Sequence, residues 1–344
     1  MLERIDASNL EPIARGCALL AAGGGGAPEL TRVMAECATA EHGPVSVVSL
    51  DDLDDDALVM PCGLVGAPTI ATERLWSGDE GRVLVEAVEQ LHTSPVAALL
   101  PFQIGGAGGL LAVAWAARLR LPVVDADGMG RTFPRLTQQA MRLAGVPASP
   151  VALTDGRGNG IVLHAVDDLS AERLAERTAV SLGGVCAVAL YVMSTAVART
   201  ATIQGSLSHA LAVGEGSADA PATLLAEGRV TAIERGIDDG ILSGWVTVRG
   251  TGDDARRELR LETQNEYLLA IEDGELLATV PDIISVLALE TGDPVPTEDL
   301  RLRERVAVVA APAPGVWTTR AGLRVAGPAA FGYDVPYASP KTAA

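Results

Sequence analysis

The feature that most constrains the fold is an alternation of short apolar segments with stretches of helical periodicity through the first two thirds of the chain. Residues 96–102 and 122–124 are short apolar runs typical of buried strands, and residues 81–92 and 110–119 carry apolar side chains at helical spacing. Strands that alternate with helices favour a sheet with helices on its faces. The sequence therefore predicts an α/β N-terminal domain, residues 1–225, with a mainly parallel sheet.

The texture of the sequence changes from about residue 227. Residues 228–234 and 241–249 are short strand-like runs, and turn residues such as 238–240 separate them. Short strands between turns indicate a smaller β-rich C-terminal domain, residues 226–344. The last residues, from 338 onward, are expected to fray, as chain ends commonly do.

Charge and composition narrow the partners of the chain. Its 344 residues carry a formal net charge of −18, so neither nucleic acid nor a membrane surface is an expected partner. The start, MLERIDASNLEPIARG, lacks the apolar core of a secretory signal, and apolar runs such as residues 185–193 are too short to span a bilayer. Four cysteines form no CxxC pair, which favours reduced thiols. We expect a cytoplasmic protein, and the Ala, Arg and Val bias is typical of GC-rich bacteria.

The run Gly23–Gly26 is the first candidate binding element. Four glycines let the backbone adopt positive φ and approach a ligand closely, and exposed amides before a helix can hold an anion. The run lacks GxGxxG and follows a helix rather than a strand, and no Lys-Ser or Lys-Thr follows it, so no nucleotide cofactor is expected. A tight turn between two helices is the alternative interpretation.

Two carboxylates, Asp125 and Asp127, follow the apolar run 122–124. Ligands of open α/β sheets bind at the carboxyl ends of parallel strands, and side chains at i and i+2 of an extended strand share a face. The pair can hold a divalent metal ion through oxygen, or one acid can act as a base while the other orients it. Arg131 can neutralise these acids or bind a carboxylate. A helix cap with a solvated neighbour is the alternative.

Other polar segments are weaker candidates. Gln103–Gly106 lies at another strand end and is expected near the acids if the two strands are neighbours; Gln103 can orient a ring amide but cannot act as a base. Cys62 is expected to be an ordinary buried cysteine. The four histidines form no HxH or HExxH pattern, so no histidine-rich metal site is predicted. Gln264–Glu266 is either a binding element or a polar strand terminus.

These segments carry a resemblance to a known family. The most specific is Leu121–Pro134, LPVVDADGMGRTFP. The others are Gly23–Pro28, Gly66–Thr69 with Glu73, Gln103–Gly106, Gln264–Glu266 and Ala311–Asp334. Together they resemble the S-methyl-thiohydantoin desulfurase family over nearly the whole chain. The resemblance implies an α/β domain followed by a β-rich domain, and a hydrolytic reaction at a five-membered thiohydantoin ring that releases the sulfur substituent.

Our main hypothesis is water attack on a small five-membered cyclic ureide or S-methyl-thiohydantoin ring. Asp125 or Asp127 would activate the water, directly or through a divalent metal ion, and amides of the two glycine loops would hold the ring as an oxyanion hole does. The predicted catalytic residues are Asp125, Asp127 and Gln103. The predicted substrate-binding residues are Gly24, Gly25, Gly26, Gly105, Gly106, Gly128, Arg131, Glu73, Asn265 and Glu266. Self-association into a homo-oligomer stays open.

One departure from the family pattern bears on activity. The family usually shows Glu-Ile-Gly-Gly followed by Asn, whereas this chain has Gln103 and then Gly108. A carboxylate has become an amide, and an amide side chain is gone. Two alternatives therefore stand beside the hydrolase: a non-catalytic binding or partner subunit that keeps the pocket, and a biosynthetic enzyme of different reaction type on the same scaffold.

Overall fold

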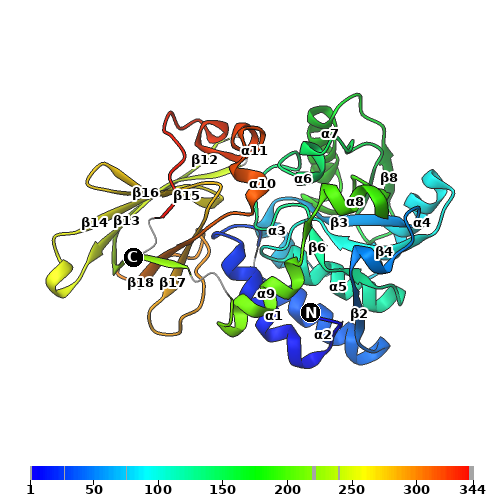
Figure 1. The fold of residues 1–344 in the computed structure, drawn as a ribbon, viewed down its shortest axis with the longest axis horizontal. Helices are drawn as coiled ribbons and strands as arrows, with labels where there is room; N and C mark the ends of the chain where they lie inside the picture. Colours follow the sequence, from blue (N-terminus) through cyan, green and yellow to red (C-terminus); the bar gives the residue numbers. More distant parts are fainter. Residues whose placement is uncertain (1, 27, 75, 219–221, 239–240, 341–344) are drawn as a thin grey trace. The chain divides into compact units, whose positions relative to one another are not determined.

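The computed structural model describes residues 2–26, 28–74, 76–218, 222–238 and 241–340. The chain forms two compact units, whose elements are labelled in Figure 1. The first unit comprises Met1–Cys17, Gly26–Gly130 and Arg135–Gly216, and the second comprises Ala18–Gly25, Arg131–Pro134 and Ser217–Ala344. Two short segments from the first half of the chain therefore belong to the second unit. The domain boundary after residue 225 stays a prediction.

The first unit is built on a sheet of nine strands within the described residues, in the order β1-β2-β5-β4-β3-β9-β7-β8, with β10 paired to β3. These strands are β1 Arg4–Ile5, β2 Val45–Val48, β3 Leu58–Gly66, β4 Val96–Pro101, β5 Val123–Val124, β7 Val151–Thr154, β8 Gly160–Leu163, β9 Val185–Ala189 and β10 Met193–Ser194. A separate short pair, β6 Ala126–Asp127 and β11 Ile203–Gln204, is antiparallel.

This sheet is mixed, so the prediction of a mainly parallel sheet is only partly right. The neighbours β2, β5, β4 and β3 run parallel to one another. In contrast, β1 pairs antiparallel with β2, and β9 and β10 pair antiparallel with β3. The β7–β8 hairpin continues from β9 in the same antiparallel fashion. The parallel order therefore ends at β3.

Eight α-helices and most of α1, whose last residues from Ala18 belong to the second unit, lie in the part of the first unit that the structure describes. They are α1 Ala7–Leu20, α2 Pro28–His42, α3 Pro68–Glu73, α4 Glu80–His92, α5 Gly108–Leu119, α6 Ala140–Leu143, α7 Asp168–Ser181, α8 Thr195–Ala201 and α9 Ser206–Glu215. Residues Gly108 to Ala117 of α5 are all buried, as expected of a helix that is apolar on every side. A Cβ added at Gly81 of α4 would lie 2.7 Å from the Trp115 side chain, so glycine permits the close packing of α4 on α5. No described helix is long and apolar enough to cross a bilayer.

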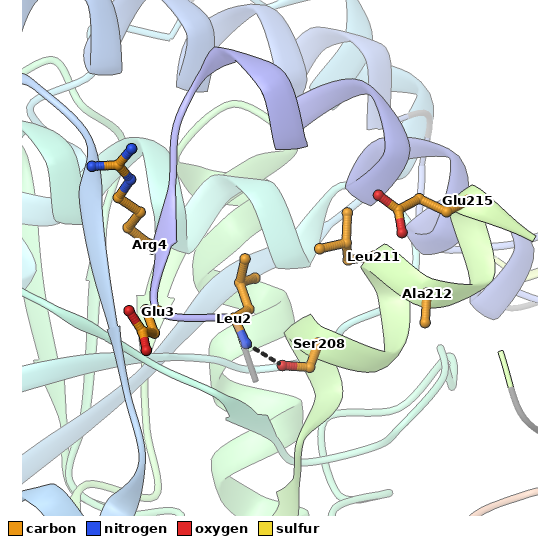
Figure 2. Close-up of a pocket in the computed structure, with 7 residues that line it drawn as sticks. All are labelled: Leu2, Glu3, Arg4, Ser208, Leu211, Ala212 and Glu215. Atoms are coloured by element: carbon orange, nitrogen blue, oxygen red, sulfur yellow. Dashed lines mark hydrogen bonds between the residues drawn. The ribbon is translucent and has the colours of Figure 1, made fainter. Parts of the chain in front are cut away.

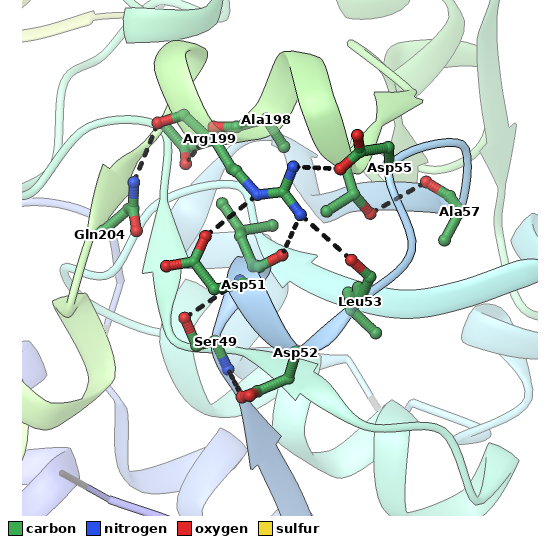
Figure 3. Close-up of polar contacts among 12 residues, drawn as sticks. Ser49, Asp51, Asp52, Leu53, Asp55, Ala57, Ala198, Arg199 and Gln204 are labelled. Carbon is green, nitrogen blue, oxygen red and sulfur yellow. Dashed lines mark hydrogen bonds and ion pairs between the residues drawn. The ribbon is translucent and has the colours of Figure 1, made fainter.

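Arg199 of α8 holds the acidic loop that follows β2 through hydrogen bonds and an ion pair (Figure 3). That loop begins as a 3-10 helix, Leu50–Asp52, with a capping box at Ser49. The guanidinium of Arg199 pairs with Asp55 and donates to the carbonyl oxygens of Leu50 and Leu53 at 3.0 and 3.1 Å. Exposed ion pairs contribute little to stability on their own, so the carbonyl contacts are what fix this loop.

The second unit is built on an antiparallel sheet, which confirms the predicted β-rich C-terminal domain. Its order among the described residues is β16-β15-β14-β13-β12-β18-β17. The strands are β12 Thr223–Asp238, β13 Ile241–Gly250, β14 Glu258–Gln264, β15 Glu266–Glu272, β16 Glu275–Thr279, β17 Ile283–Ala288 and β18 Arg305–Ala311. Buried residues such as Val230, Leu261 and Val308 form its core. Short helices α10 Gly315–Thr318 and α11 Arg320–Ala326 follow β18.

The C-terminal segment is held in place through Ser339. Ala338 accepts the Thr279 amide at 2.9 Å and donates its own amide to the Thr279 hydroxyl at 2.9 Å. The buried carboxylate of Asp282 accepts the hydroxyls of Tyr337 and Ser339 at 2.9 and 2.7 Å. The expectation that the chain frays from residue 338 is therefore wrong for residues 338 and 339, and residues after 340 lie outside the described part.

Candidate functional site

Asp125 holds the N-terminal end of α9. Pairing of β6 with β11 brings the start of this helix beside the two acids. One carboxylate oxygen of Asp125 accepts the amides of Leu207 and Ser208 at 2.8 and 3.1 Å, and the other accepts the Ser208 hydroxyl at 2.5 Å. The first amides of a helix lack partners within the helix and carry a partial positive charge, so an acid stabilises this end.

Asp127 is fully buried and fastens two loops. Its carboxylate accepts hydrogen bonds of 2.6–3.0 Å from the amides of Ile104, Met129 and Gly130 and from the hydroxyl of Ser206. Burial raises the pKa of Asp127 to about 6, and these hydrogen bonds oppose the rise. Because Ile104 follows β4, a direct neighbour of β5, the second glycine loop and this acid meet in the structure.

Both oxygens of each acid therefore accept hydrogen bonds from donors of the protein itself. A general base needs a lone pair directed at its water, and a metal ligand needs one directed at the ion. In this structure Asp125 binds the N-terminal end of α9 by hydrogen bonds. Asp127 binds Ser206 of α9 and the backbone of two loops. The catalytic role of both acids stays a prediction.

A pocket of the first unit lies beside α9 (Figure 2). Leu2 and Arg4 line it from one side, and Leu211 and Glu215 line it from the helix. Ser208, which donates to Asp125, accepts the Leu2 amide at 3.2 Å. This pocket is thus connected to the predicted site residues through one hydroxyl that is already engaged on both sides.

The first glycine run is divided between the units. Gly26 belongs to the first unit, and Gly23–Gly25 belongs to the second. The carbonyl oxygen of Gly23 accepts the Thr297 amide at 2.9 Å. Gly23 has a φ of 86°, and an added Cβ there would collide with the Tyr267 ring. Glycine at this position is therefore required both by the turn and by close packing.

Asn265 makes the turn between β14 and β15, with a φ of 57°. Its side-chain oxygen accepts the Leu242 amide at 3.0 Å, and its carbonyl oxygen accepts the Thr297 hydroxyl at 2.6 Å. These contacts fix the turn that presents the next residue, Glu266. The substrate-binding role of Asn265 stays a prediction.

Arg131 is fully buried, and only part of its hydrogen-bonding capacity is used. Nε donates to the Thr132 carbonyl oxygen at 2.8 Å, and Nη1 donates to those of Pro281 and Asp282, both at 2.7 Å. Nη2 is buried and has no hydrogen-bond partner among the described residues. Burial lowers the pKa of Arg131 to about 10, so the guanidinium remains charged at neutral pH.

Glu266, the first residue of β15, is 1% exposed. Its Oε1 lies so close to Gly24 that an added Cβ at that glycine would collide with it. Its Oε2 is buried without a hydrogen-bond partner in the described part of the chain. Burial raises the pKa of Glu266 to about 8 although the nearby charge of Arg131 opposes the rise, so the carboxyl is mostly protonated at neutral pH.

Gly24, Arg131 and Glu266 form what we call the Arg131–Glu266 site. Buried polar atoms without partners are rare in folded proteins, and an acid with a pKa near neutrality is suited to proton transfer. Asp282 and Thr297, which support this site through backbone contacts, have no motif in the sequence that would mark them. The site therefore combines predicted residues with supports that only the structure reveals.

Two family profiles together match residues 8–340 of the chain. The S-Me-THD-like N-terminal domain matches residues 8–165, and the S-Me-THD-like C-terminal domain matches residues 166–340. The chain belongs to the S-Me-THD-like family. A crystal structure of a protein from Chromobacterium violaceum is similar over 98% of this chain and 99% of that chain, with 26% sequence identity and a TM-score of 0.80. None of the curated proteins matches this chain.

Gln103 and Gly108, where the sequence departs from the pattern that the resemblance implies, lie in contact with each other. A Cβ added at Gly108 would lie 2.8 Å from Cγ of Gln103 and 2.6 Å from the Gln103 carbonyl oxygen. The Gln103 amide itself makes a long contact of 3.4 Å with the carbonyl oxygen of Gly105. A larger residue at position 108 would therefore displace residue 103. Gly105 and Gly106 are both buried.

The other residues considered in the sequence analysis have ordinary surroundings. Glu73 is exposed at the end of α3. Gly128 lies beneath Gln139, whose amide oxygen would collide with an added Cβ. Cys62 is fully buried and burial raises the pKa of its thiol to about 12, which confirms an ordinary core cysteine. Within the described residues, no three His, Cys, Asp or Glu side chains are grouped so that they could hold a metal ion, and the divalent ion stays a prediction.

Proposed function

We propose that the chain is a hydrolase-like enzyme of the bacterial cytoplasm that acts on a small five-membered cyclic ureide or S-methyl-thiohydantoin ring by water attack. Membership of the S-Me-THD-like family supports the ring class. One observation carries the chemistry: Glu266 is buried, and its Oε2 has no hydrogen-bond partner among the described residues. This burial raises the pKa of the carboxyl to about 8. An acid that is protonated at neutral pH can act as a general acid toward a ring nitrogen.

The proposed reaction has three steps. Glu266 donates its proton to the ring nitrogen that is double-bonded to the carbon bearing the methylsulfanyl group. Water adds to that carbon, which forms a C–O bond, and one proton of the water returns to Glu266. The C–S bond then breaks, the remaining hydroxyl proton passes to the departing sulfur, and hydantoin and methanethiol leave.

Release of methanethiol tests this proposal. We expect the purified chain to convert S-methyl-thiohydantoin into hydantoin and methanethiol in equal amounts, because each attack by water expels one sulfur substituent. A thiol-reactive dye measures the methanethiol, and chromatography measures the ring. If the chain yields neither product under conditions in which it binds the ring, the hydrolase assignment fails.

A non-catalytic binding or partner subunit is the second candidate, and the Gln103–Gly108 contact favours it. Gln103 precedes α5 and Gly108 begins it. By the resemblance, Gln103 stands in place of a carboxylate and Gly108 in place of an amide side chain. In that case the double variant Gln103→Glu with Gly108→Asn would gain turnover that the natural chain lacks. If the natural chain turns over the ring on its own, this candidate is excluded.

A further inference from the structure

We propose that the Arg131–Glu266 site recognises one amide edge of its ligand, that is, a carbonyl oxygen next to an N–H group. This inference rests on the proposed function, since it names the part of the ring that the site recognises: the ring nitrogen carries an N–H once Glu266 has given it a proton, and it keeps that N–H in hydantoin. It is carried by two buried side chains of the second unit, each of which has one polar atom without a partner among the described residues.

The orientation of Arg131 is fixed by the backbone. Three carbonyl oxygens, those of Thr132, Pro281 and Asp282, hold Nε and Nη1 at 2.7–2.8 Å. The guanidinium is planar, so fixing two of its nitrogens also fixes the direction of Nη2. A guanidinium nitrogen can only donate, and the ligand must therefore bring an acceptor such as a carbonyl oxygen.

Glu266 can bind a different kind of ligand group from the one that Arg131 binds. Its carboxyl can donate when protonated and accept through its other lone pairs. Arg131 and Glu298 are the charged groups that act on it. No nitrogen–oxygen contact within 4.0 Å joins Arg131 to Glu266, so the two side chains do not satisfy each other within the described structure. A small planar group that carries an acceptor beside an N–H offers a partner to each of the two side chains, and each amide edge of a cyclic ureide has this arrangement.

A neutral ligand suits this site better than an anion. The buried carboxylate of Asp282 already acts on the charge of Arg131. A second anion would add a buried charge without its own counterion, which is strongly unfavourable. Gly24 completes the arrangement, because any side chain there would push Oε1 of Glu266 out of its place.

Calorimetric titration at neutral pH with three probes tests the inference. Hydantoin has N–H groups beside carbonyl oxygens, 1,3-dimethylhydantoin has none, and acetate is a small anion. We expect hydantoin to bind at least about 10-fold more tightly than 1,3-dimethylhydantoin, because a lost hydrogen bond to a charged or buried group has an effect of this size. Acetate is expected to bind more weakly than hydantoin.

Two pairs of variants assign the effect to the site. Glu266→Gln keeps a donor and an acceptor and should keep hydantoin affinity, whereas Glu266→Leu should lower it about 10-fold. Gly24→Ala should weaken hydantoin binding through Glu266, whereas Gly236→Ala, at a glycine with open space around it, should not. The second pair also reports on folding, since circular dichroism of both alanine variants shows whether the second unit is intact.

Several outcomes would overturn the inference without touching the proposed function. These are equal affinity for the two hydantoins, unchanged binding in Glu266→Leu, and preferred binding of acetate. If methanethiol is released in spite of such a result, the chain is a hydrolase with a different recognition site. If binding depends on N–H groups but no methanethiol is released, the inference stands and the proposed hydrolysis fails.

Discussion

Glu266→Gln is expected to lower the turnover of S-methyl-thiohydantoin by about 10²- to 10⁴-fold, the usual contribution of a positioned general acid. Glutamine has nearly the same shape as glutamate, but its carboxamide has no acidic proton to give at neutral pH. The loss should therefore appear in kcat, with KM changed little. Steady-state kinetics of methanethiol release measure both constants.

Glu80→Gln is the matched control for this variant. Glu80 lies in the first unit, is 1% exposed and has a buried Oε2 without a hydrogen-bond partner in the described residues, as Glu266 does in the second unit. Its substitution should leave turnover close to that of the natural chain. A Glu266→Gln variant as active as the Glu80→Gln variant would remove Glu266 from the mechanism.

Glu266→Gln should also flatten the pH dependence of stability. The unfolded chain releases this proton near the ordinary value of 4.5, whereas the folded chain keeps it up to about pH 8. Between these values the folded chain binds more protons than the unfolded chain, so the free energy of unfolding falls as pH rises, by at most about 1.4 kcal/mol per pH unit. The contribution is complete below about pH 4.5 and is lost above about pH 8.

Asp127→Asn is expected to lower the free energy of unfolding by about 2–4 kcal/mol, because hydrogen bonds to a charged group contribute about 1.5–3 kcal/mol each. Asparagine keeps one acceptor oxygen, but its NH₂ group cannot accept a hydrogen bond. It would face backbone amides that now donate to Asp127, such as those of Ile104 and Gly130. Urea unfolding followed by circular dichroism near neutral pH measures the change.

Asp334→Asn serves as the control for Asp127→Asn, since Asp334 is exposed. Exposed substitutions usually change stability by less than about 0.5 kcal/mol. If Asp127→Asn unfolds at the same urea concentration as Asp334→Asn, the loops do not depend on this carboxylate. If turnover is also abolished without loss of stability, Asp127 has the catalytic role that the sequence predicts.

Local sequence patterns predict which segments form strands and helices better than they predict the direction in which neighbouring strands pair. The apolar run 96–102 and the periodic stretch 110–119 became β4 and α5, because burial and helical spacing are encoded within each segment. The apolar run 185–193 contains β9. An apolar run predicts a buried strand but does not indicate whether that strand pairs parallel or antiparallel with its neighbour. The antiparallel pairing of β9 with β3 is decided by the chain connections, so the mixed sheet could not be derived from local sequence.

The sequence identified residues of the candidate site but did not predict what each of them contacts in the fold. Asp125 and Asp127 stand out because acids follow an apolar strand, yet their partners Ser206 and Ser208 lie far along the chain and become neighbours only through the β6–β11 pairing. Glu266 was marked by its place at a predicted strand end and by the family resemblance. Its burial, which raises its pKa, depends on the packing of the folded unit and leaves no trace in the adjacent residues.

The protonation state of Glu266 is the most direct test of this account. A chain labelled with carbon-13 at the glutamate carboxyl groups can be titrated by NMR over a pH range that spans the ordinary glutamate pKa of 4.5 and the raised one of about 8. We expect a carboxyl signal with a midpoint near pH 8 that the Glu266→Gln variant lacks. This expectation is contradicted if the signal lost in that variant titrates near the ordinary value, because Glu266 would then have no proton to donate at neutral pH.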